Sequence, residues 1–525
     1  MAGFVDVLLR GLALCGQAIA IGGVVFALLL LLRPALPESG PARSRLTRSL
    51  VLTAIGAAVV AGAQMLSLGV QLLVLSDAAA GWPIAEVADT SFFRAGLVRI
   101  LSCAGIVVGC AVLAKRPERR RWWIALAALT VLLSAGSAWT SHAAGRLGPR
   151  AGLLVLDALH QLAAGVWIGG LLHLTMLASS RADAEWSPTL LKRFSTTSFV
   201  SVVVLVVAGA GLTLGYVDGT SALLGTSYGS MILTKAIVLG GLILLGAANF
   251  FAVRRLPEGA GISLPRLRRF VEVEFGLGAT VLFVAASLTS LPPAGDVVDD
   301  RASLAEVGVR FAPQWPVLTS PKITDMPVDD RNAPRTDADR AWSEFNHHWA
   351  GIFVVAMGFL ALVHATGRVR WARHWPLVFL GLAGFLLVRN DPGAWPLGPL
   401  GFWESMRYPE VLQHRIFILL VIAFGIFEWL VRTDRVRLHG AALVFPLLCA
   451  VGGGLLLTHS HAGLNLKQEY LVEITHVPLG VLAMVTGWSR WLELRLPPSA
   501  SRLPGRIWPI AFTLIGVALI LYRES

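Results

Sequence analysis

The sequence predicts an all-α polytopic membrane protein with about 14 transmembrane helices. Of the 525 residues, 55% are hydrophobic and only 14% are charged, and the mean hydropathy is +0.68. Apolar runs of about 20 residues recur along the chain and match the thickness of a bilayer. The expected spans are 4–32, 50–76, 95–114, 122–142, 151–178, 195–217, 230–253, 269–291, 347–366, 374–389, 411–431, 439–457, 470–489 and 507–522.

The first span has no basic segment before it and is longer than the core of a signal peptide. We therefore expect it to be a retained membrane helix. The four cysteines all lie inside apolar runs, which is typical of small buried side chains and not of a disulfide framework.

Basic residues in the loops set the predicted orientation. The loops after odd-numbered spans carry 27 Lys and Arg, whereas the short loops after even-numbered spans carry five. By the positive-inside rule both termini lie outside, so the topology is N-out/C-out in a bacterial cytoplasmic (inner) membrane. The net charge of +12 comes from these short loops between membrane spans. It therefore follows from the membrane topology, and no nucleic acid is expected as a partner. No GxxxxGK[ST] motif is present, so no nucleotide is expected.

One long loop predicts the domain division. Residues 292–345 are rich in Pro, Asp and Arg and are expected to be a mostly irregular extracytoplasmic linker. This linker separates an eight-helix domain, residues 1–291, from a six-helix His-rich domain, residues 346–525.

The stretch LLTHSHAGLNLKQEYLVEITH (Leu456 to His476) predicts a metal site in the second half. Ionisable groups at the edge of a bilayer are costly and usually mark function. Glu473 and His476 are three residues apart and so share a helix face. We expect His461 and His476 to be ligands in one outer-leaflet site, completed by His414 and one of His347 and His348, with Glu473 orienting or binding. The candidate residues of this half are His347, His348, His414, His459, His461, Glu473 and His476, with Arg415 as a charge partner.

An internal repeat predicts a second site. WTSHAAGRLGPRAGLLVLDALHQLAAGVW (Trp139 to Trp167) resembles THSHAGLNLKQEYLVEITHVPLGVL (Thr458 to Leu482), because each has Ser-His-Ala before an acid-x-x-His pair. Spans 4–5 and 12–13 are therefore expected to be parallel repeats, and the repeat extends, as a further expectation, to spans 1–5 and 9–13. The candidate ligands of the first half are His142, Asp157 and His160, with Arg99 and Lys235 as charge partners or gate residues.

The first half also resembles a known family. DALHQLAAGVWIGGLLHL (Asp157 to Leu174) is similar to the signature helix of the bacterial copper resistance D (CopD/PcoD, YcnJ-like) membrane proteins. The following segment, Lys192 to Phe251, has the family's Arg-Phe-Ser entry, its Tyr-Gly before a helix bearing Lys235, and its closing Asn249. The resemblance covers about residues 1–293 and is specific over 150–293, whereas the second half resembles no family that we can name. It implies a cytoplasmic-membrane protein that handles copper and moves it inward from the periplasm.

These observations favour copper uptake through outer-leaflet His/carboxylate sites, with membrane lipid and a periplasmic copper-binding protein as partners. Imidazole suits Cu(II), but the chain has only eight Met and no paired-Met motif for Cu(I), so the oxidation state stays open. The alternative is a membrane electron-transfer protein in which two histidines hold haem b. A carboxylate-bridged di-metal enzyme and a membrane scaffold with interfacial histidines are further readings. Whether the protein is an enzyme stays open, and a transporter or metal-binding protein is favoured.

Overall fold

The computed structural model describes residues 2–31, 41–78, 81–146, 148, 150–177, 188–256, 265–325, 336–458 and 465–524. In these residues the chain is helical, and 14 helices are long and apolar enough to cross a membrane. The predicted fold class and helix count are therefore confirmed. The orientation and the internal repeat stay predictions.

The helices of the first half begin and end as follows: α1 Ala2–Leu31, α2 Pro41–Ala78, α3 Ile84–Asp89, α4 Ser91–Lys115, α5 Arg120–Ala138, α6 Arg150–Ala164, α7 Gly170–Leu177, α8 Pro188–Tyr216, α9 Thr220–Gly225, α10 Ser227–Arg254 and α11 Pro265–Leu288. The second half contains α12 Leu304–Phe311, α13 Asp337–Ala365, α14 Val378–Arg389, α15 Phe402–Ser405, α16 Pro409–Arg432, α17 Val444–Thr458, α18 Leu466–Arg495 and α19 Pro498–Ile520. Short 3₁₀ turns precede α14 (Arg370–Leu377) and α17 (Ala441–Leu443).

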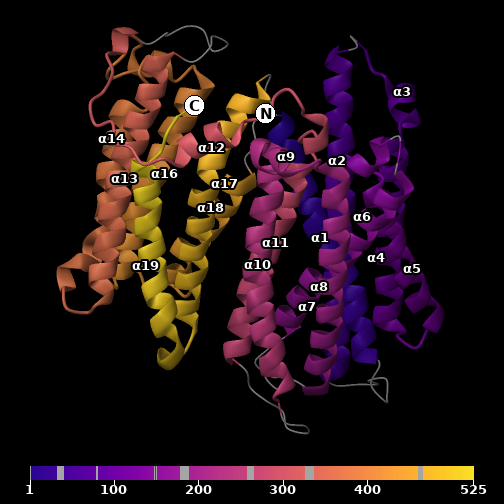
Figure 1. Ribbon diagram of the computed structural model, residues 1–525. Helices are drawn as coiled ribbons and strands as arrows, with labels where there is room; N and C mark the ends of the chain where they lie inside the picture. The colour runs from indigo at the N-terminus through magenta and orange to yellow at the C-terminus, as the bar shows by residue number, and fades with distance from the viewer. Residues whose placement is uncertain are drawn as a thin grey trace. The chain divides into compact units, whose positions relative to one another are not determined.

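The chain divides into two compact units (Figure 1). The first comprises residues 1–301 with 458–464, and the second comprises residues 302–457 with 465–525. These units are groups of residues in mutual contact, whereas the predicted boundaries concern domains that fold independently. The predicted domain boundaries therefore stay a prediction.

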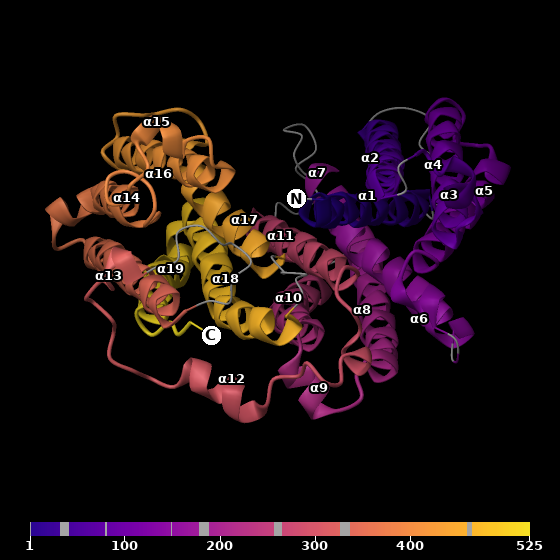
Figure 2. The same ribbon diagram turned by 90° about the horizontal axis from the view of Figure 1, so that it is seen from above.

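Helix α1 is at the centre of the first unit. It contacts α2, α11 and α7, and it lies beside α2 in both views (Figures 1 and 2). A Cβ on Gly16 would lie 2.7 Å from the Gly56 carbonyl oxygen, and the reverse distance is the same. Small residues let membrane helices approach this closely and gain packing contacts. Buried Val24, Ile106 and Leu126 fill the space between α1, α2, α4 and α5.

A π-helical turn, Gly165–Gly169, joins α6 to α7 within a single membrane span. Its glycines face α1 closely, since a Cβ on Gly169 would lie 1.7 Å from the Ala18 carbonyl oxygen. A Cβ on Gly22 would likewise lie 2.4 Å from backbone atoms of Gly169. The wide turn thus coincides with the place where α1 crosses this span. Such turns are frequent at functional sites.

The second unit is organised around aromatic packing. Helix α19 lies between α13 and α18, contacting both (Figures 1 and 2). Trp375, Phe445, Trp508 and Phe512 form a buried cluster, with ring centroids of neighbouring pairs about 6 Å apart or less, as in Phe445–Trp508 at 5.7 Å. The Arg432 guanidinium lies 4.8 Å from the Trp375 ring centroid, a favourable cation–π distance.

The segment expected to be mostly irregular contains a helix and the start of another. Helix α12 begins at a capping box of Ser303 and Glu306. A second capping box, made by Thr336 and Asp339, starts α13 at Asp337, ten residues before the predicted span. Side-chain caps satisfy the first amides of a helix, which explains why these polar segments are ordered.

Candidate functional site

The first unit contains a cavity of about 390 Å³. Its walls come from α1, α6, α8, α10 and α11 and are mostly apolar. Four of the predicted residues of the first half line it together: His142, Asp157, His160 and Lys235. A largely apolar cavity with a few convergent polar groups is typical of a binding site.

Local structure explains why these side chains meet. Asp157 and His160 are three residues apart on α6 and therefore share a face. His142 opens a 3₁₀ turn after α5, where the Ser141 hydroxyl accepts a hydrogen bond from the Ala143 amide. Gly209 on α8 leaves room for the imidazole, because a Cβ there would lie 2.9 Å from His160 Cε1.

The His160 ring is held in one tautomer. Its Nδ1 lies 2.9 Å from the Leu205 carbonyl oxygen, which can only accept, so Nδ1 carries the proton. Nε2 therefore keeps its lone pair, and the Lys235 ammonium donates to it at 3.3 Å. The nitrogen that could bind a metal is thus occupied by an ammonium group.

Asp157 places a carboxyl group beside this pair. Its side chain interacts with those of Ser141 and Gln161, and it also attracts Lys235 electrostatically. Its second oxygen, Oδ2, is buried and has no hydrogen-bond partner within the described part of the chain. A buried acceptor without a donor is costly unless a ligand satisfies it.

His142 completes the polar side of the cavity. Its Nε2 lies 3.1 Å from the Leu288 carbonyl oxygen, which leaves Nδ1 with the lone pair. Burial lowers the pKa of His142 below its ordinary value, so the imidazole is neutral at pH 7 and able to bind a metal. Its ring meets Tyr216 and Tyr228 edge-on, with centroids 6.3 and 6.1 Å apart.

In the second unit the structure brings His347 and His476 together. Their ring centroids are 6.3 Å apart, and Tyr522 stacks on His347 at 3.9 Å. Each Nδ1 lies 2.8 Å from a carbonyl oxygen one turn earlier, that of Ser343 or Val472. Both rings therefore hold the proton on Nδ1 and keep the Nε2 lone pair. Buried Glu473 lies one turn before His476 on α18.

The remaining histidines of this half lie in other surroundings. His348 is fully buried, accepting from the Val317 amide at 2.8 Å and donating to the Tyr522 carbonyl at 2.9 Å, so both ring nitrogens are used. His414 Nδ1 lies 2.7 Å from Asp391 Oδ1. His459 and His461 lie outside the described residues.

The two predicted arginines have backbone and amide partners. Arg415 donates to the carbonyl oxygens of Leu387, at 2.7 Å, and Trp395, at 2.5 Å, which ties α16 to the end of α14. Arg99 donates to Gln64 Oε1. Among the described residues, no group of three or more His, Cys, Asp or Glu lies close enough together to hold a metal ion.

Sequence reasoning missed several residues of these two sites: Gln161, Tyr216, Tyr228, Asp391 and Tyr522. A compositional signal was present for three of them. The chain has only five tyrosines, and Tyr216, Tyr228 and Tyr522 all contact a candidate histidine ring. In contrast, nothing in the sequence around Asp391 indicates its partner, His414, which is 23 residues away.

Comparisons with known proteins concern the first half. Residues 1–153 match the model of the copper resistance protein D-like N-terminal domain, and residues 188–288 match that of copper resistance protein D. The chain is 30% identical over 174 residues to the copper transport protein CutJ of Bacillus subtilis, covering 33% of this chain and 31% of that protein. It is 26% identical over 140 residues to the inner membrane protein YebZ of Escherichia coli, covering 26% of this chain and 48% of that protein.

The chain thus spans less than half the length of either curated relative that it matches. No solved structure matches it. His142 and Lys235 lie inside the matched segments, whereas Asp157 and His160 lie between them.

Proposed function

The N-terminal half of this chain belongs to the copper resistance protein D family, and from this premise we propose that the protein moves copper inward across the bacterial cytoplasmic membrane. The observation that carries the proposal is the cavity of the first unit, which gathers His142, Asp157, His160 and Lys235 among apolar walls. Copper is the substrate here, and the cavity is its binding station.

Charge exchange gives the cavity a way to bind copper and release it. Copper binding at His160 Nε2 requires the Lys235 ammonium to leave that nitrogen, which lies 3.3 Å away. The free Asp157 oxygen offers the incoming cation a counter-charge. Return of the ammonium to Nε2 then displaces copper. Lys235 is in this scheme the gate, and Asp157 the charge partner of whichever cation is present.

In the second unit we propose a further copper station at His347 and His476. The two Nε2 lone pairs are available, and Glu473 lies one turn from His476. Imidazole nitrogen suits Cu(II). His414, which Asp391 orients, is the proposed outer approach, because an imidazole held by a carboxylate is a typical metal-ligand arrangement. His459 and His461 remain candidates of the same station.

The haem alternative gains no support. Tyr522 stacks on one face of His347 at 3.9 Å and lies 5.8 Å from the His476 ring. The haem alternative pairs His414 with His476, or one of His347 and His348 with His461. His348 uses both ring nitrogens in hydrogen bonds, and His461 lies outside the described residues. A periplasmic copper-binding protein stays a proposed partner, which would deliver the ion to the outer loops.

Copper accumulation tests the cavity of the first unit. In cells that express the protein, Asp157→Asn and His160→Ala should lower the initial rate of copper uptake roughly tenfold or more, because loss of a ligand or its charge partner costs about 10–100-fold in metal affinity. Asp89→Asn, at an exposed carboxylate in α3, is the matched control and should keep the full rate. Full uptake by both cavity variants would rule the cavity out as the path.

The second station is tested by binding and not by uptake. His476→Ala should lower the Cu(II) content of the purified protein by one equivalent. Glu473→Gln should lower the affinity for that Cu(II) ion by roughly 10–100-fold. His439→Ala, an exposed histidine in the loop after α16, should change neither value. An unchanged copper content in His476→Ala would contradict a site there.

A further inference from the structure

We infer that a second, smaller cavity of the first unit binds a small monovalent anion beside Arg99. The cavity has a volume of about 60 Å³ and lies between α1, α2, α4 and α5. This exceeds the ~10–15 Å³ that admits a single water and is far below the ~300–1,000 Å³ of sites for larger organic ligands. A ligand of one to a few atoms fits it.

Arg99 is a buried cation without a counter-charge. Only 7% of its surface is exposed, and it lies two turns inside α4. Within the described residues its hydrogen-bond partner is a neutral amide, Gln64 Oε1, and no carboxylate pairs with it. Cys103 is one turn away, but a thiol of ordinary pKa is uncharged at pH 7. Removing one partner from a buried ion pair typically costs several kcal/mol, so a lone buried guanidinium calls for an anion.

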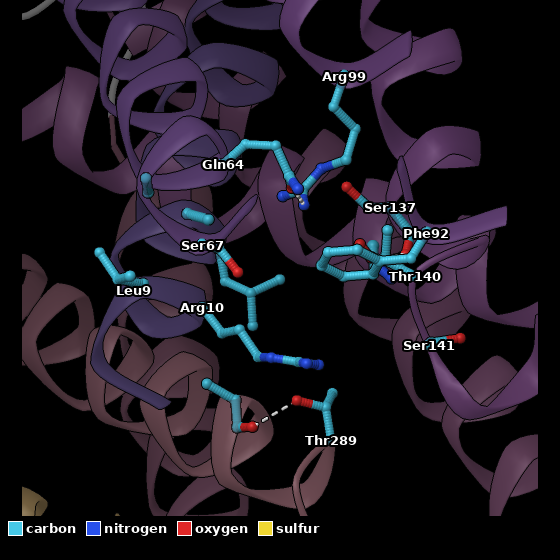
Figure 3. A pocket seen from close by; sticks show the side chains of 15 residues that line it. Leu9, Arg10, Gln64, Ser67, Phe92, Arg99, Ser137, Thr140, Ser141 and Thr289 are labelled. Atoms are coloured by element: carbon cyan, nitrogen blue, oxygen red, sulfur yellow. Dashed lines mark hydrogen bonds between the residues drawn. The ribbon is translucent and has the colours of Figure 1, made fainter. Parts of the chain in front are cut away.

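The donors around the cavity are arranged for an acceptor. Arg99 Nε and Gln64 Nε2 are both buried and lack partners in the described chain. The Gln64 amide has one sensible orientation, since a guanidinium has no acceptor and must face the amide oxygen. Its NH₂ group is therefore left as a free donor. Figure 3 shows the Arg99 and Gln64 head groups meeting, with Arg10 reaching into the same cavity.

Arg10 favours an anion over a cation, and two glycines leave space for the donors. Arg10 lines the cavity and is close enough to Arg99 to repel it, although Asp6 pairs with Arg10 at 2.7 Å. Glycines make room for the Arg99–Gln64 pair, because a Cβ on Gly96 would lie 2.8 Å from Gln64 Nε2 and one on Gly136 would lie 3.0 Å from Arg99 Cγ. The space is thus shaped around two donors and a net positive charge.

The anion cavity adjoins the copper cavity. Leu14, Ser141, Gln161 and Thr289 line both. Gln17 connects Gln161, which lines both cavities, to Ser137 of the anion cavity. Its amide donates to Gln161 Oε1 at 3.0 Å and accepts from the Ser137 hydroxyl. An anion beside Arg99 would cancel the positive potential that opposes entry of a metal ion next door. This coupling rests on the proposed function, whereas the anion site itself does not.

Chloride binding to the purified protein, without copper, is the test. Radiolabelled chloride should bind saturably at one site per chain, and unlabelled gluconate, which is too large for the cavity, should not displace it. Arg99→Gln should reduce this binding at least tenfold. Arg94→Gln, at an arginine of the same helix that is 68% exposed and paired with Asp89, is the matched control and should bind normally.

Gln64→Glu keeps the inference testable if Arg99→Gln fails to fold. This near-isosteric change places a permanent carboxylate against the guanidinium, so the variant should fold and lose chloride binding. Chloride should raise the melting temperature of the unaltered protein, because it binds the folded state, and should leave that of the variant unchanged. No saturable binding to the unaltered protein, or unchanged binding in Gln64→Glu, would overturn the anion site and show that water fills the cavity. Because no copper is present, that result is independent of the copper uptake experiments.

Discussion

At the scale of single residues, the central feature of the proposed function is an exchange between Lys235 and a metal ion at one nitrogen. A His160 ring with its proton on Nδ1 can bind one partner at Nε2, either an ammonium hydrogen or a metal. Both partners are cations. Asp157 attracts the Lys235 side chain, and in the proposed function it attracts the metal ion in the same way. In the proposed function the site therefore holds one positive charge at a time. Such an arrangement would limit the affinity for copper, as the proposed release of the ion requires.

Removal of the ammonium should tighten metal binding. Lys235→Met frees Nε2 from a charged hydrogen bond worth about 1.5 kcal/mol or more, which corresponds to about a tenfold lower Kd for Cu(II). The same variant should transport more slowly, because nothing displaces the bound ion. Titration with Cu(II) and an uptake assay measure the two effects, with Lys115→Met at the exposed end of α4 as control. Weaker Cu(II) binding in Lys235→Met would contradict the exchange.

Helix α12 shows how a short element outside the bilayer is held in place. Lys467 Nζ at the start of α18 lies 2.7 Å from Glu306 Oε1. Ala302 and Val307 pack against Tyr470 and Leu471 of α18. The same carboxylate also accepts from the Ser303 amide at 2.8 Å, so one side chain both caps α12 and docks it. The helix thereby packs on α18 at Tyr470 and Leu471, a few residues before Glu473 and His476.

Acid should release α12 from α18. The Lys467 ammonium, with the Ser303 amide, lowers the pKa of Glu306 from its ordinary 4.5 to about 2. A carboxyl group with a depressed pKa stabilises the fold above its unfolded value and loses that effect as the proton binds. Docking is therefore complete above pH 4.5 and is lost as the pH falls toward 2.

Hydrogen exchange of residues 304–311 measures this release. After correction for intrinsic rates, protection should be the same at pH 7 and pH 5 and should fall several-fold by pH 2.5. Glu306→Gln should already lack the protection at pH 7. The membrane-embedded part of α13 serves as the internal control and should exchange alike throughout. Equal protection of α12 in Glu306→Gln and the unaltered protein would mean that the apolar contacts alone hold it.

At the scale of the whole molecule, the alternation of loops rich and poor in Lys and Arg predicts that the basic loops face the cytoplasm and that both termini face outside. Residue 120 is the first residue of α5, directly after a basic loop, and residue 299 lies in the long segment after α11; both are exposed. We expect Asp299→Cys to react with a membrane-impermeant maleimide in intact cells and Arg120→Cys to react only after lysis. The unaltered protein, whose four cysteines lie inside spans, gives the background. The opposite labelling pattern would reverse the topology and make the proposed copper movement outward.

The sequence predicts the spans and the family well because both depend on local composition. Apolar runs alone located 14 helices, and the motifs near Asp157 and Lys235 indicated a family whose models match residues 1–153 and 188–288. The sequence was less informative about which residues of different helices contact one another. The clustering of His142 with Asp157 and His160 followed from loop and helix order. The contact between His160 and Lys235, and that between His414 and Asp391, depends on helix rotation, which no local pattern fixes.

The extra residue in the π turn at Gly165–Gly169 acts as a phase shift along one span. Each residue of an α-helix turns the chain by about 100°, so deleting one glycine from the turn would swing everything after it by that angle. His173, which now contacts Ser49 and Ile19 of α2 and α1, would be carried off its partners. The same span thus places Asp157 and His160 at the larger cavity, while its other end contacts α1 through His173. The inserted residue sets the rotation of the cavity-lining part of the span independently of the part that packs on α1. Substitutions in one part can then be selected without disturbing the other.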